Sequence, residues 1–234
     1  MTLIIDNLTY FFIFLIAASF LVLRLAFIGK FFRVINTLIH ETGHSIMALI
    51  TDGEVLKVEL FSDTSGTTIT KSKSKFGQFM IAFAAYPFAS VSAFLFVFLL
   101  SKNLFNELLL FLSVIALLNL IFYVRNRHGI IWILSFLCII FINFRFGNIF
   151  SSFVFATIIT AITLLESFWS VLVLVYLSFI KSKAAGDATN LAHISHVPAC
   201  IWSLIFLLIS SFLFFKSVII YWHYDFTALQ KCLI

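Results

Sequence analysis

The chain has 234 residues, of which 62% are hydrophobic and only 11% are charged, and its mean hydropathy is +1.14. A typical globular domain is about one-quarter charged, so this composition excludes an ordinary soluble protein. The net charge of +5 would suggest nucleic acid as the partner of a soluble protein, but in a membrane protein it reflects Lys and Arg in cytoplasmic loops. We therefore expect a multi-pass protein of the lipid bilayer, in the cell membrane, with no nucleic-acid partner.

The first apolar segment is Tyr10–Leu23. No basic residue precedes it and no small-residue cleavage site follows it, so we predict a retained membrane anchor and not a cleaved signal. Three cations follow this segment: Arg24, Lys30 and Arg33.

The next segment, Val34–Ile50, contains the sequence His40-Glu41-Thr42-Gly43-His44. On a helix, two His four residues apart lie one turn apart on one face, where both can bind one metal ion. This H-E-x-x-H spacing is typical of zinc peptidases, in which zinc lowers the pKa of a bound water to about 7 and the Glu accepts the proton. The flanking residues are apolar, and ionisable groups inside a membrane are usually functional.

The stretch from Gly53 to Lys75 is the one clearly non-helical part of the chain. Apolar and polar residues alternate over Val55–Phe61, and Thr67–Thr70 is β-branched. Ser62–Gly66 separates these two runs, so we predict a β-hairpin. Its role is open between a solvated connection and an edge that pairs with an extended peptide.

The rest of the chain is a series of apolar runs of membrane-spanning length. The tract 149–180 is long and is interrupted by Glu166, so it is either two short spans or one broken, tilted helix. We predict an all-α polytopic protein with about six to eight transmembrane helices in a single domain, 1–234, with the hairpin as an insert. The further runs are Phe76–Leu100, Leu104–Val124, Ile130–Phe144, Ile149–Ile180 and Ala199–Tyr221.

Two His leave a catalytic zinc one protein ligand short. Asp187 lies in a polar loop just before the last span, where it can turn inward, although it would also serve as a helix N-cap. Glu166 is the alternative, because an acid in an apolar tract is costly unless it has a function. The chemistry of the residues favours Asp187 but leaves both candidates open.

Taken together, these features resemble the site-2 protease family of intramembrane zinc metallopeptidases. The resemblance rests on the H-E-x-x-H helix, the hairpin after it, a span containing Tyr86-Pro87, and Gly186–Asn190 before the last span. It is closest to the compact bacterial-type branch, which lacks a PDZ domain. It implies Asp187 as the third zinc ligand, although the Leu-Asp-Gly of the larger family members is here Gly186-Asp187-Ala188.

The function we predict is that of an endopeptidase cutting a membrane protein or peptide in or near its membrane span, with Glu41 as the general base. Asn119 and Asn190 are candidate oxyanion donors, and the hairpin edge Val55–Phe61 is the candidate substrate edge. The alternative is a non-catalytic protease-like membrane protein or a metal-binding transporter. The sequence does not determine the oligomeric state.

The distribution of charge predicts a topology. The hairpin, the Arg125–Arg127 turn and the Lys181–Asn190 loop share the cytoplasmic side, which lets all three zinc ligands meet. The cations from Arg24 to Arg33 then lie on the opposite side, against the positive-inside rule, and the sequence offers no partner for them.

Overall fold

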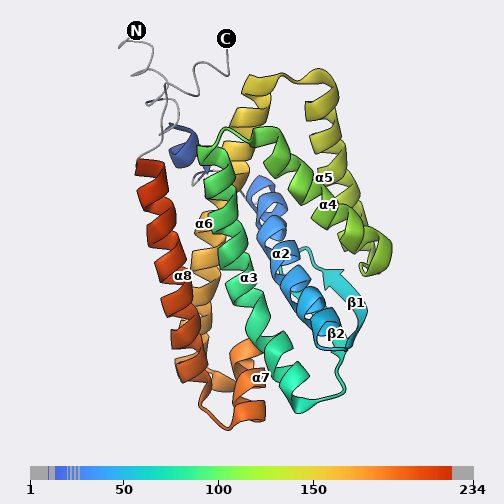
Figure 1. Cartoon of the computed structure of the whole chain (residues 1–234), viewed down its shortest axis with the longest axis vertical. Coiled ribbons are helices and arrows are strands. Elements are labelled where there is room, and N and C mark those ends of the chain that lie inside the picture. Colours follow the sequence, from blue (N-terminus) through green and yellow to red (C-terminus); the bar gives the residue numbers. More distant parts are fainter. Residues whose placement is uncertain are drawn as a thin grey trace.

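The computed structural model describes Tyr10, residues 14–19, Leu21, Leu23, Leu25 and residues 27–222. These residues form a helical bundle with one small β-hairpin (Figure 1). The predicted first span, Tyr10–Leu23, falls partly outside the described residues. The elements are α2 (Ile28–Ile50), β1 (Glu54–Leu60), β2 (Gly66–Lys71), α3 (Lys75–Ser101), α4 (Phe105–Phe122), α5 (Arg127–Phe146), α6 (Ile149–Ile180), a 3-10 turn (Ser182–Ala184), α7 (Gly186–Ser195) and α8 (Ala199–Trp222).

The predicted fold class is confirmed. Five helices in the described part of the chain are long and apolar enough to cross a membrane, namely α3, α4, α5, α6 and α8. The tract Ile149–Ile180, for which two spans had remained possible, is a single unbroken helix of 32 residues. At 1.5 Å per residue it is about 48 Å long, which exceeds the roughly 30 Å hydrocarbon core of a bilayer.

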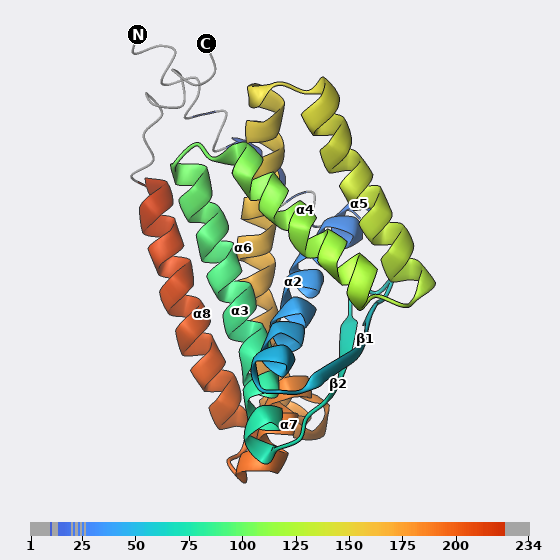
Figure 2. The ribbon, with the colours of Figure 1, turned by 45° about the vertical axis from the view of Figure 1, so that its right-hand side comes forward.

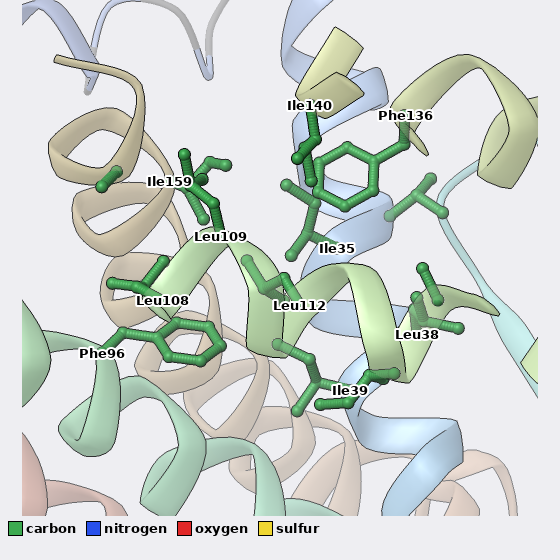
Figure 3. Packing of buried hydrophobic residues seen from close by; sticks show 14 of the residues in the cluster. Ile35, Leu38, Ile39, Phe96, Leu108, Leu109, Leu112, Phe136, Ile140 and Ile159 are labelled. Carbon is green, nitrogen blue, oxygen red and sulfur yellow. The ribbon is translucent and has the colours of Figure 1, made fainter. Parts of the chain in front are cut away.

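Helix α2 has two opposite faces that serve different purposes. Ile35, Leu38 and Ile39 are fully buried against α3, α4, α5 and α6 in the main hydrophobic core (Figure 3). His40 and His44 lie on the other side of the helix, as the 3.6-residue period requires. The apolar face therefore holds α2 in the bundle, while the polar face is left free for chemistry.

A close contact between α2 and α3 depends on Gly43. A Cβ atom at this position would lie 2.9 Å from Phe88 Cβ and 3.0 Å from Ala85 Cα. Small residues let membrane helices approach to this distance. The Gly inside the H-E-x-x-H sequence thus brings α3 close to the helix that carries the two His.

The β-hairpin predicted for residues 53–75 is present, with β1 and β2 antiparallel and joined from Glu54–Lys71 to Leu60–Gly66. It runs back alongside α2 toward the turn between α4 and α5 (Figure 2). One hydrogen bond, from Thr37 Oγ1 to Thr64 O (2.7 Å), ties the hairpin turn to α2. Backbone at membrane depth must find partners inside the protein or line a wet cavity.

The outer edge of β1 is already occupied. Val58 N donates to Tyr123 O (2.9 Å), Arg125 N donates to Val58 O (3.3 Å), and the Asn126 side chain bonds both the N–H and the C=O of Leu60. The expectation that the edge Val55–Phe61 receives substrate is therefore wrong, because the turn between α4 and α5 takes its hydrogen bonds. The same contacts join this turn to the hairpin.

Candidate metal centre

His40, His44 and Asp187 converge on one point. The Nε2 atoms of His40 and of His44 each lie 3.3 Å from Asp187 Oδ2, and the three ligand atoms all lie within 4.8 Å of one another. Bonds of about 2.0–2.1 Å at a tetrahedral zinc separate neighbouring donor atoms by roughly 3.3 Å. Two nitrogens and one carboxylate oxygen are ordinary catalytic zinc ligands, so this donor set fits the ion.

Two helices position the three ligands. His40 and His44 lie one turn apart on α2, with their rings 5.0 Å apart, and Asp187 lies in the first turn of α7. His44 Nδ1 lies 2.8 Å from Ile81 O on α3, to which it donates as Nδ1–H. That bond leaves the Nε2 lone pair of a neutral His44 pointing at a carboxylate oxygen, an arrangement that a shared cation stabilises.

Glu41 is held beside the ligands by the hairpin. Its side chain is buried and lines the same cavity. Thr68 Oγ1 on β2 donates to Glu41 Oε2 at 2.6 Å. Gly66 lies so close that a Cβ atom there would be 2.6 Å from Glu41 Oε1. The hairpin thus fixes the carboxylate through one hydrogen bond and one close backbone contact.

A cavity of about 470 Å³ surrounds these groups. Its walls come from four helices and the hairpin, which brings together residues that are far apart in the sequence. Tyr86 contributes one wall, with its ring 4.6 Å from that of His40 in an edge-to-face contact. The lining residues are Asn36, Thr37, His40, Glu41, His44, Thr64, Gly66, Thr67, Thr68, Tyr86, Ser170, Gly186, Asp187 and Asn190.

The structure separates the two Asn residues that the sequence suggested as oxyanion donors. Asn190 lines the cavity. Asn119 does not: its Nδ2 donates to Thr42 Oγ1 and to Ile115 O, both at 2.9 Å, on the core side of α2. The expectation that Asn119 stabilises an oxyanion is therefore wrong.

Glu166 lies away from the metal ligands and pairs with Arg33, whose Nε is 3.1 Å from Glu166 Oε1. Arg33 Nη2 also donates to Leu23 O at 3.2 Å. This pair explains the acid in the apolar tract of α6. It also supplies the partner that the sequence could not identify for one cation of the Arg24–Arg33 cluster.

Sequence reasoning missed Asn36, Thr68, Tyr86 and the Ile81 carbonyl. The four-residue spacing of Asn36, His40 and His44 is a signal that was available, because it places Asn36 on the metal-binding face. The other three come from β2 and α3, and only the packing of these elements against α2 brings them to the site.

A model of the Peptidase M50B-like family matches residues 12–217 of the chain. The chain belongs to this family. M50 peptidases are zinc metallopeptidases of membranes, so the resemblance to site-2 proteases is confirmed, and no PDZ domain is found in the described residues. No curated protein and no solved structure matches significantly. Membership in the M50B-like family, with five apolar helices, indicates a protease that crosses a membrane several times.

Proposed function

We propose that this M50B-like protein is an intramembrane zinc metalloendopeptidase that hydrolyses a peptide bond in or near a membrane-spanning substrate. The observation that carries the proposal is the convergence of His40, His44 and Asp187 in one cavity with Glu41. His40, His44 and Asp187 would hold the ion. When bound, zinc would act as a Lewis acid that polarises a carbonyl and lowers the pKa of water.

The protein's own residues supply the rest of the chemistry. Glu41 is the general base: it accepts the proton of the attacking water and then passes that proton to the leaving amine. The hydrogen bond from Thr68 occupies Oε2 and orients the carboxylate, which leaves Oε1 for the proton. Asn190, which lines the cavity without an intramolecular hydrogen bond of its own side chain in the described structure, would donate to the oxyanion.

The free edge of β2 is the proposed substrate-binding edge, in place of the β1 edge. In the described part of the chain, backbone hydrogen bonds of β2 go to β1, and none links its other edge to another element. Gly66, Thr67 and Thr68 of β2 line the cavity. A substrate segment that leaves its helix needs new partners for its N–H and C=O groups, and an open strand edge provides them.

Photo-crosslinking tests this edge directly. A photoreactive residue at Ile69 on β2 should crosslink to a bound single-span peptide. The same residue at Leu56 on β1, which is also exposed, is the matched control and should crosslink to lipid or detergent only. Crosslinking of the peptide from Leu56 and not from Ile69 would overturn the assignment of the edge.

Glu41→Gln tests the catalytic proposal. This variant keeps all three metal ligands, so the purified protein should retain zinc while cleavage of a single-span model peptide is lost. Glu107→Gln, at the start of α4 and outside the cavity, is the control and should behave like the wild type. A protein that binds zinc but cuts equally well with Gln at position 41 would refute the proposed role of Glu41. Zinc without any cleavage in the wild type would favour a non-catalytic member of the family.

A further inference from the structure

Asn36 is a buried polar side chain without a partner at the wall of the catalytic cavity. It lies one helical turn before His40 on α2 and is only 7% exposed. Its Oδ1 atom is buried and accepts no hydrogen bond from the described residues. The cavity that holds the metal ligands is the space that its side chain lines.

An unpaired amide at this depth is costly, because burying a polar group without a hydrogen bond is unfavourable and the more so in a membrane. Asn119 is also buried and its Oδ1 is also unpaired, but its amide nitrogen bonds Thr42 and Ile115, so it braces the core. Asn36 braces nothing in the described structure. Because Asn36 lines the cavity and makes no side-chain hydrogen bond there, its amide is available to a molecule that enters the cavity.

The shape and position of the group indicate which molecule. A carboxamide offers one acceptor oxygen and two donor hydrogens, which complements the C=O and N–H of a peptide unit. Asn36 lies on the N-terminal side of His40, away from α7 and the end of the bundle where α2 stops. Asn36 thus faces the part of the cavity that lies toward the N-terminus of α2, away from the hairpin base and from Asp187.

We propose that Asn36 is a substrate-positioning residue that hydrogen-bonds the main chain of the peptide beside the scissile bond. It faces the substrate from α2 while the free edge of β2 pairs with the same segment. The bound substrate segment has lost the hydrogen bonds of its helix, and hydrogen bonds to Asn36 replace some of them. This inference rests on the proposed peptidase function and adds a residue that selects an extended peptide.

The test uses zinc-loaded protein in detergent and three hydroxamates, which all bind zinc through the same group. Acetohydroxamate carries no peptide, whereas two Leu-Leu hydroxamates extend their dipeptide from opposite sides of the zinc-binding group. Calorimetry gives the dissociation constants for the wild type, Asn36→Leu, Asn36→Ala and the control Asn119→Leu. Because one hydrogen bond to a buried partner is lost, both Asn36 variants should bind at least one dipeptide hydroxamate about tenfold more weakly.

Acetohydroxamate affinity and zinc content should stay unchanged in the Asn36 variants. Thermal stability should stay equal or rise in Asn36→Leu, because an unpaired polar group is removed. Unchanged affinity for both dipeptides in the Asn36 variants overturns the inference, as does weakening in the leucine variant alone, which would indicate steric blocking. If the wild type holds no zinc and does not bind acetohydroxamate, the proposed function fails and the inference fails with it. This result is distinct from equal binding of the dipeptide hydroxamates by the wild type and the Asn36 variants, which overturns the inference alone.

Discussion

Gly66→Ala should displace the general base without touching the metal ligands. The added Cβ would lie 2.6 Å from Glu41 Oε1, 2.8 Å from Glu41 Cγ and 2.6 Å from Thr37 Cγ2. Ordinary contact begins at 3.4 Å, so the Glu41 side chain and the hairpin must separate by most of an ångström. A catalytic group misplaced by about 1 Å can cost about 100-fold in rate. We expect a loss of that size in kcat with zinc content unchanged.

The assay is single-turnover cleavage of a single-span model peptide in detergent micelles, with zinc measured on the same preparations. Gly129→Ala is the matched control, because its Cβ would crowd Asn126 Oδ1 equally, at 2.6 Å, but outside the cavity. Adding Thr37→Ser to Gly66→Ala removes the clashing methyl group of Thr37 and keeps the hydroxyl that bonds Thr64 O, so part of the rate should return. A folded, zinc-loaded Gly66→Ala protein with the wild-type rate would refute the reasoning.

Two further outcomes are expected. Asp187→Ala should lose zinc, whereas Glu166→Gln should keep it. Glu166→Gln should lose about 1 kcal/mol of stability in a thermal-shift measurement, because the partly exposed Arg33 loses its partner. Zinc loss in the Glu166 variant alone would reverse the choice of third ligand. The topology is tested with single Cys residues in a background without native Cys. A Cys at position Asp52 or Lys183 should react with an impermeant thiol reagent from one side of the membrane, and a Cys at position Lys102 should react from the other side. Labelling of the first two from opposite sides would contradict the single crossing of α6.

The sequence predicted those features that depend on neighbours along the chain. Composition predicted the membrane class, and the spacing of His40 and His44 predicted two ligands on one helical face, because that face repeats every 3.6 residues. Alternation and the Ser62–Gly66 turn predicted the hairpin. The long tract 149–180 stayed ambiguous, because length and one acid do not distinguish a broken helix from a continuous one whose acid is paired.

The third ligand shows where reasoning along the chain ended. Asp187 and Glu166 were both acids with a physical argument behind them, and family resemblance favoured the first. In the structure Asp187 lies against the two His, and Glu166 meets Arg33. Both partners are more than 130 residues away in sequence, so only the packing of α6 against α2 and of α7 against α3 decides which acid reaches the site.

By itself, the sequence determined the chemistry available to this protein: a membrane-embedded pair of His, an adjacent Glu and a hairpin beside them, all set by local periodicity and turn residues. The tertiary structure decided how these groups are used. Hydrogen bonds from the α4–α5 turn occupy the β1 edge and leave β2 open, and the bond from Thr68 holds Glu41. The reason is physical: backbone and polar groups in a bilayer must find partners, and those partners come from elements that are distant in the sequence.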